Sequence, residues 1–172
     1  MKKALVLFLS LSFFVTNGLF AQSKKELKKK KQQEEYQTTK KLIESGEFVF
    51  EPDWATTQKG KRISISANGY TLKINGNLTS ANLPFFGQAY TASYGGNGGI
   101  EFKNENTTFK IEYNDKKNRI KIKFSAKNKI ENYDVTLAIF GNGNSNLNIS
   151  SSSRSNMKYH GKTKEILTKK EE

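Results

Sequence analysis

The chain contains no cysteine, and this absence closes several chemical routes at once. No disulfide framework can form, and the lipid attachment of bacterial lipoproteins, which needs a cysteine, is excluded. Small secreted domains of oxidising eukaryotic compartments usually depend on disulfides. An exported domain without cysteine therefore fits a bacterial periplasm or exterior better.

Histidine is nearly absent as well, since His160 is the only one. A metal site of nitrogen and sulfur ligands cannot be built from a single histidine. The serines at positions 150–153 and 155 have no positioned acid partner, so the sequence offers no nucleophilic set. The aspartates are isolated in sequence, at Asp53, Asp115 and Asp134. We therefore expect no catalytic residue, no metal and no cofactor.

A hydrolase that works with carboxylates alone is the enzyme alternative. Glu101 and Glu112 could approach each other across strands, as the two acids of a glycoside hydrolase must. Both residues fall in outward register, however, which favours a solvated pair. The alternative therefore ranks below a protein without catalytic activity.

Long apolar runs are absent except at the start of the chain. Two lysines precede the apolar segment from Ala4 to Val15, and a small residue, Ala21, closes the region. This arrangement is typical of a signal peptide over residues 1–21 with cleavage near Ala21. A membrane anchor is the alternative, but the run falls short of the ~20 residues that a span needs. We expect export to the periplasm or the exterior.

Acidic residues are scarce relative to lysine and arginine, which gives a net charge of +13. Such a charge can attract nucleic acid or anionic lipid. Expected export makes nucleic acid an improbable partner, and much of the charge is explained by a soluble basic surface with a solvated arm. The partners that we consider are an apolar or aromatic small ligand and an envelope protein.

Residues 22–45 have the composition of a lysine-rich helical arm. Lys30 and Glu34 stand at the spacing where side chains meet on a helix, and Gly46 offers a stop. Apolar residues are sparse in the first half. Only the last two turns can therefore dock on a core, through Tyr36, Leu42 and Ile43, whereas Leu27 stands alone.

After Phe48 the apolar period changes from helical to two, which predicts strands. Asn68-Gly69 predicts a two-residue hairpin that pairs Ile65 with Leu72 and Ile63 with Ile74. Leu78 comes into phase with Ile74 if Asn75-Gly76-Asn77 makes a three-residue turn with a bulge.

Similar alternation continues through the second half of the chain. The predicted cross-strand neighbours are Tyr113 with Ile120, Ile111 with Ile122, Phe124 with Tyr133, Ile122 with Val135, Ile120 with Leu137, Ile139 with Leu147, and Ile149 with Met157. Each pair keeps the apolar residues on one face.

These patterns together predict an all-β fold preceded by one N-terminal helix. About ten short strands would form an antiparallel meander, closed into a barrel or folded into a two-layer sandwich. The β domain would span residues 46–161, and a charged tail would follow at residues 162–172.

The least ordinary stretch is the aromatic–glycine segment, residues 82–99, which reads NLPFFGQAYTASYGGNGG. Pro84 removes a backbone donor and marks an edge, a bulge or a corner of the sheet. Aromatic and amide side chains beside it could line the mouth of a barrel as a small-ligand site. They could equally fill the core of a structural corner. The candidate ligand-binding residues are Phe85, Phe86, Gln88, Tyr90 and Tyr94.

Several motifs resemble the domain-of-unknown-function family DUF4251. They are LPFFGQAY at 83–90, YGGNGGIEF at 94–102, Ile-Phe-Gly at 139–141, and Ser-x-Ser-Arg followed by Tyr-x-Gly ending at Gly161. The resemblance covers about residues 36–165 and implies an exported protein of a Gram-negative bacterium. The family signature looks like LPYFG, then a basic or polar residue, then Ala-Tyr. This chain departs from it at Phe85, where the pattern favours tyrosine, and at Gln88, where arginine is frequent. The resemblance implies no activity.

Overall fold

The computed structural model describes residues 24–66, 68–90, 98–129 and 131–166. The chain divides into two compact units, Met1–Glu34 and Glu35–Glu172. Of the first unit, residues 24–34 are described and are helical, and the helix ends at residue 44. Among the described residues, no helix combines the length and the apolar character that crossing a membrane requires.

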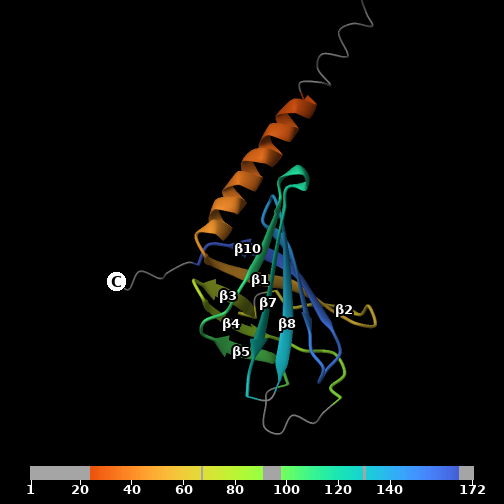
Figure 1. Ribbon diagram of the computed structural model, residues 1–172. Helices are drawn as coiled ribbons and strands as arrows, with labels where there is room; N and C mark the ends of the chain where they lie inside the picture. Colours follow the sequence, from red (N-terminus) through yellow and green to blue (C-terminus); the bar gives the residue numbers. More distant parts are fainter. Residues whose placement is uncertain (1–23, 67, 91–97, 130, 167–172) are drawn as a thin grey trace, which may run out of the picture. The chain divides into compact units, whose positions relative to one another are not determined.

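The second unit contains a ten-stranded antiparallel sheet that curls into a half-barrel (Figure 1). Along the sheet the order is β5-β4-β3-β1-β10-β9-β8-β7-β6, and the short β2 pairs with β1. The strands are β1 (Glu47–Thr57), β2 (Arg62–Ser64), β3 (Thr71–Asn75), β4 (Leu78–Leu83), β5 (Ile100–Asn104), β6 (Lys110–Asn114), β7 (Arg119–Lys127), β8 (Asn132–Phe140), β9 (Asn144–Ser150) and β10 (Met157–Lys164). A 3-10 turn, η1 (Asp115–Lys117), joins β6 to β7. The predicted all-β fold with a preceding helix is confirmed.

The curl follows from the connection between β5 and β6, which lie at opposite ends of the strand order. Residues 105–109 cross from one end to the other, and a fully extended chain of this length reaches only about 20 Å. A flat sheet of nine neighbouring strands would be roughly 38 Å wide. The sheet must therefore bend until its ends approach, and the Phe102 and Phe124 rings of β5 and β7 lie 6.5 Å apart.

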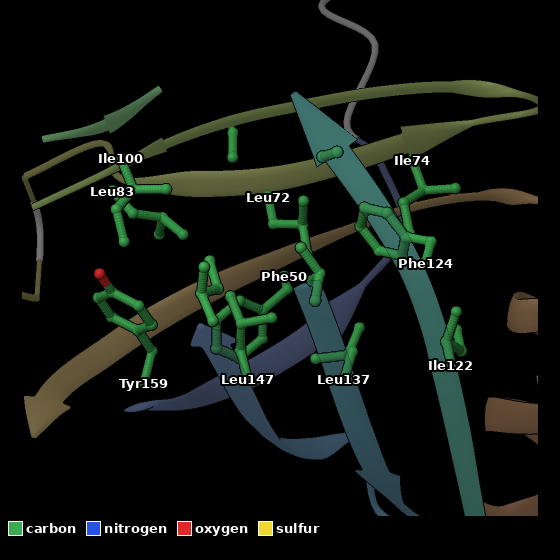
Figure 2. Packing of buried hydrophobic residues seen from close by; sticks show 14 of the residues in the cluster. Phe50, Leu72, Ile74, Leu83, Ile100, Ile122, Phe124, Leu137, Leu147 and Tyr159 are labelled. Carbon is green, nitrogen blue, oxygen red and sulfur yellow. The ribbon is translucent and has the colours of Figure 1, made fainter. Parts of the chain in front are cut away.

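The core fills the concave side of the curled sheet. Leu72 and Ile74 of β3 lie across the interior from Phe124 of β7 and Leu137 of β8 (Figure 2). These side chains are at most 6% exposed. Every second residue of a strand points inward, so the remaining residues form an outer face that meets water.

The last turns of the N-terminal helix complete this core. Tyr36 and Ile43 are fully buried, whereas Leu27 is 63% exposed. The Tyr36 hydroxyl donates to Asp115 Oδ1 at 2.5 Å, and the Thr39 hydroxyl donates to the Gly141 carbonyl at 2.7 Å. The prediction that the last turns dock on the core is therefore confirmed.

Two predicted hairpins have the predicted register. Ile111 pairs with Ile122 and Tyr113 with Ile120 between β6 and β7, and Met157 pairs with Ile149 between β10 and β9. The two strands of the first hairpin differ in burial. Ile122 is 1% exposed but Ile111 and Tyr113 are each 39% exposed, because β6 is an edge strand.

The predicted Asn68-Gly69 hairpin is wrong. β2 and β3 do not pair with each other; both pair with β1, through Ile63 with Ala55 and Leu72 with Phe50. The chain turns back earlier, where Gly60 adopts a positive φ of 85° and its amide donates to the Thr57 carbonyl. The eleven-residue β1 is long enough to serve both partners on one edge, and this pairing overrides the local turn signal.

Other pairings keep the predicted face but shift along the strand. Ile122 pairs with Leu137, and Leu137 pairs with Leu147, each two residues from the prediction. Between β3 and β4 a two-residue turn pairs Asn75 with Leu78, so the predicted bulge is absent from this described hairpin. A period-two pattern fixes the face of a strand, and a shift of two residues preserves that face.

Candidate functional site

The aromatic–glycine segment separates its predicted side chains. Phe85 is half-buried against the core, Phe86 is 42% exposed and Tyr90 is 62% exposed. Gln88 is exposed as well. Tyr94 lies outside the described residues. The four described candidates therefore do not converge on one enclosed space.

Backbone hydrogen bonds tie this segment to the stretch before β10. Ala89 forms an isolated bridge with Arg154, the Ser155 amide donates to the Gln88 carbonyl at 2.8 Å, and the Tyr90 amide donates to the Ser153 carbonyl at 2.9 Å. The Ser155 hydroxyl accepts from the Gln88 amide at 2.9 Å. Residues 88–90 thus lie against residues 153–155.

Pro84 and Gly87, two residues of the signature motif, fix the same segment through close contacts with its neighbours. The buried Tyr159 hydroxyl donates to the Pro84 carbonyl at 2.8 Å, and burial raises the pKa of Tyr159. A Cβ atom on Gly87 would lie 2.1 Å from Ser155 Oγ and 2.7 Å from the Phe85 ring. Only glycine fits there without displacing its neighbours.

A buried ion pair lies beside this segment, and we name it with its partners the Arg154 clasp: Arg154, Glu131, Tyr133, Ser151 and Phe85. Arg154 Nη2 lies 2.7 Å from Glu131 Oε2, and Nε donates to Oε1 at 2.9 Å. Ser151 and Tyr133 donate their hydroxyls to the same carboxylate. The guanidinium stacks on Phe85 at 4.8 Å.

The clasp also reaches the glycines that precede β5. Arg154 Nη1 donates to the Gly99 carbonyl at 2.9 Å and to the Gly98 carbonyl at 3.4 Å. Burial and the hydrogen bond to Glu131 raise the pKa of Tyr133 to about 12, so its hydroxyl stays protonated. The side chains of Arg154 and Glu131 are only 9% and 2% exposed. Their donors and acceptors are occupied by the chain itself, which makes the clasp a structural joint.

Sequence reasoning missed this joint. Arg154 belongs to the Ser-x-Ser-Arg motif and could have been singled out as a charged residue among serines. Glu131 gave no signal, because it stands in a connection that pattern alone cannot place.

The outer face of the sheet carries a second, different arrangement. Across seven strands, one register row contains four cations and no acidic side chain. We name it the outer basic row; from β2 to β6 it comprises Arg62, Thr56, Lys158, Asn148, Thr136, Lys123 and Lys110. Glu112 in the adjacent row contacts Lys110 at 3.5 Å and Lys123 at 4.0 Å. Among the described residues, Arg62 and Lys158 have no acidic partner within ion-pair distance.

The unpaired end of this row adjoins the single tryptophan of the chain. Arg62 stacks on the Trp54 indole at 4.3 Å, and Trp54 is 38% exposed. His160 on β10 is the cross-strand partner of Trp54 on β1. Its Nδ1 is hydrogen-bonded to Asn146 Oδ1 at 2.7 Å. Partial burial is the largest cause that lowers the pKa of His160, and the positive charges of Arg62 and then Lys158 lower it further. We name these five residues the Trp54 cluster: Trp54, Arg62, Lys158, His160 and Asn146.

A β-bulge directs Trp54 to the outer face. Pro52 pairs with Gly161 and Trp54 pairs with His160, so Asp53 is an additional residue without a partner of its own. The two strands approach closely here, since a Cβ on Gly161 would lie 2.0 Å from the Glu51 carbonyl oxygen. Pro52 and Ala55 are buried, and the residues between them are exposed. The bulge thus changes which alternate residues face the core.

The two glutamates considered for a hydrolase, Glu101 on β5 and Glu112 on β6, are both exposed, and Glu112 forms ion pairs with Lys110 and Lys123. The described residues contain no cluster of three or more His, Asp or Glu side chains that could hold a metal ion.

The fold is an antiparallel half-barrel with one docked helix, and comparison with known proteins agrees with it. The chain belongs to the family DUF4251, described as a domain of unknown function, whose model matches residues 30–163. It is similar in fold to the crystal structure of a DUF4251 family protein from Bacteroides eggerthii, with a TM-score of 0.56 and 17% sequence identity over 76% of this chain and 87% of that chain. No curated protein matches the chain.

Proposed function

We propose that this chain is an exported, non-enzymatic binding domain that recognises an anionic polymer of the cell envelope through its outer basic row. The observation that carries the proposal is the row itself, in which four cations follow one register line without an acid among them. Adjacent strands lie about 4.8 Å apart, so the row extends over roughly 29 Å along the curved sheet. That length suits a chain-like ligand.

The residues between the cations support binding of a hydrated polymer. Thr56, Asn148 and Thr136 supply hydroxyl and amide groups at intervals along the row. The charges of Arg62 and Lys158, which have no acidic partner among the described residues, raise the local concentration of an anionic partner and accelerate its association. The described residues offer no comparable set of catalytic groups, which is why we favour binding over turnover.

Export is the second half of the proposal. It rests on the signal-peptide pattern of residues 1–21, which lie outside the described residues, and on the lack of cysteine. A cell-fractionation experiment tests it: we expect the protein in the periplasmic or secreted fraction, shortened by about the length of a signal peptide. A full-length cytoplasmic product would contradict it.

Binding is tested with the purified protein, two polyanions (polygalacturonate and polyphosphate) and neutral dextran. We expect both polyanions to bind more tightly than dextran, and their affinity to fall as salt rises. The test variant replaces Arg62, Lys110, Lys123 and Lys158 with glutamine. A control variant with the same change in net charge replaces the four consecutive lysines at 28–31, which are exposed on the N-terminal helix.

The two variants should differ clearly. Loss of four contacts of up to ~1 kcal/mol each should weaken polyanion binding of the row variant by at least about tenfold. The helix variant should retain most of the affinity. Equal losses would show that only net charge matters, and the outer basic row would then not be the binding surface.

A structural or partner-binding role in the envelope is the second candidate. Phe86 and Tyr90 expose large aromatic surfaces within five residues of each other, and aromatic residues are enriched where proteins meet. Replacing both with serine should abolish co-purification of an envelope protein if this role holds. Unchanged co-purification would remove these two residues from consideration.

A further inference from the structure

We propose that the Trp54 cluster is a subsite for an acidic sugar unit, a hexuronate, within the polymer that the outer basic row binds. The inference rests on the proposed function and goes beyond it, because it names the chemical class of the unit and the residues that read it. Three properties of the cluster lead to it: a partly exposed indole, a guanidinium over the indole that has no acidic partner among the described residues, and neighbouring hydrogen-bonding groups.

The guanidinium of Arg62 provides the anion site. Its Cζ atom lies over the Trp54 ring, 4.3 Å from the ring centroid. Within the described chain no side-chain hydrogen bond or ion pair occupies its N–H groups. A planar fork of this kind matches a carboxylate with two parallel hydrogen bonds. Lys158 adds a second positive charge to the same neighbourhood, as its effect on His160 shows.

The other members of the cluster suit the ring and hydroxyls of a sugar. The 38% exposed indole of Trp54 offers an apolar surface with a polar N–H. The hydrogen bond of His160 Nδ1 to Asn146 leaves the other ring nitrogen, Nε2, able to meet a ligand hydroxyl. On the side of β1 opposite β10, Ser64 of β2 is the cross-strand partner of Trp54 and adds a hydroxyl.

A carbohydrate fits this surface better than a nucleic acid. Proteins that bind single strands stack successive bases on several aromatic side chains. Along the register row through Trp54, the positions on the neighbouring strands are Ser64, His160, Asn146 and Ala138, so the indole stands alone. One stacking surface among polar groups and cations is the arrangement that a single charged sugar ring requires.

The lone tryptophan makes the subsite directly measurable, since all indole fluorescence comes from Trp54. The purified protein is titrated with oligogalacturonate, with a neutral oligosaccharide of equal length, and with polyphosphate. We expect a saturable change in fluorescence with oligogalacturonate alone. Calorimetry measures affinity independently, so that variants without tryptophan can be compared.

The variants are chosen in matched pairs. Arg62→Gln should weaken oligogalacturonate binding by about tenfold, the effect of losing one good charged contact. Trp54→Phe should weaken it as well and, because it removes no charge of the outer basic row, should leave polyphosphate binding within about twofold. The controls are Arg119→Gln and Phe140→Leu, which alter an arginine–aromatic contact on β7 and β8, at 4.8 Å. We expect the controls to bind oligogalacturonate normally.

Each result has a definite meaning. If both polyanions bind through the outer basic row but Trp54 fluorescence does not respond and Trp54→Phe binds normally, the sugar subsite is overturned while the proposed function stands. A fluorescence response to polyphosphate equal to that for oligogalacturonate would reduce the cluster to a general anion site and would also overturn the inference. If no polyanion binds, both proposals fail.

Discussion

Two arginines stack on aromatic rings in this molecule, and their surroundings differ in one decisive respect. Arg154 lies over Phe85 at 4.8 Å and Arg62 lies over Trp54 at 4.3 Å. Arg154 is buried, and its N–H groups meet a carboxylate and two backbone carbonyls. Arg62 is exposed and, within the described residues, its side chain has the ring as its partner.

The comparison teaches that the same stacked pair can serve stability or recognition, depending on what occupies the edge of the guanidinium. In the Arg154 clasp the chain itself supplies acceptors along that edge, namely the Glu131 carboxylate and the Gly98 and Gly99 carbonyls. In the Trp54 cluster the edge remains available to an anion. The residues that carry the family resemblance, such as Pro84 and Gly87, lie beside the clasp and hold a structural corner.

The largest expected effect is loss of one partner of the clasp. Arg154→Met should reduce the free energy of unfolding by about 3–5 kcal/mol, because it leaves Glu131 buried without its counter-charge. Urea denaturation measures the change, and Arg62→Met is the matched control, with an expected loss of at most ~1 kcal/mol.

A double variant distinguishes a buried charge from lost packing. Replacing both Glu131 and Arg154 with methionine removes the unpaired charge, so it should be more stable than Arg154→Met alone. If Arg154→Met cost no more than Arg62→Met, the clasp would not be the joint that we describe.

The next effect concerns the glycine packed between the clasp and the core. Gly87→Ala should cost about 1–3 kcal/mol, because the new methyl group would push against Ser155 and the Phe85 ring. Denaturant unfolding of Gly87→Ala, of Ser155→Ala and of the double variant provides the measurement. The free energy of unfolding should fall less in the double variant than the sum of its losses in the two single variants, since removing the Ser155 hydroxyl relieves the closest contact. Strict additivity would contradict the contact.

Alkaline pH should destabilise the fold through the buried hydroxyl of Tyr133. The pKa of Tyr133 is raised from 10.0 to about 12 by burial and by its hydrogen bond to Glu131. A raised pKa in the folded state means that the contribution is complete below pH 10 and is lost as pH rises through about 12. Unfolding midpoints recorded across this range should therefore fall.

Tyr133→Phe supplies the control for this pH dependence. This variant should show a smaller fall of the unfolding midpoint with rising pH. Some of the fall should remain, because the pKa values of Tyr36 and Tyr159 are raised as well. An unchanged slope would show that Tyr133 ionises equally easily in the folded and unfolded chains.

The smallest effect on stability should come from the Trp54 cluster. Arg62→Gln and Trp54→Phe remove an exposed stacking contact and should each change the free energy of unfolding by at most ~1 kcal/mol. Thermal and urea unfolding provide the measurement. A loss comparable to that of Arg154→Met would mean that the cluster supports the fold, and the contrast between the two arginines would disappear.

Much of the fold could be predicted because alternation of apolar residues is a strong local signal. It predicted most of the strands, the buried face of those that are not at the β6 edge, and the hairpin at Asp115–Lys117. Spacing could not give the register where a loop length was uncertain, since shifts of two residues preserve the buried face. The pairing of Ile122 with Leu137 rather than Val135 is such a shift.

The functional surfaces were harder to predict, and for different reasons. Arg154 and Glu131 are 23 residues apart and come together through the pairing of β8 with β9, which sets Asp134 opposite Ser150. Arg62 and Lys158 stand in one row only through the pairings of β1 with β2 and with β10, and the first of these replaced the predicted Asn68-Gly69 hairpin. Long-range strand order, which local pattern does not contain, decides which surface residues become neighbours.

The additional residue in β1 sets the environment of the only tryptophan. If Asp53 were paired in regular alternation, without the bulge, it would face water, the indole would turn toward the interior and Ala55 would move outward. A single unpaired residue therefore separates a surface that displays an aromatic ring from a strand that must find room for it inside.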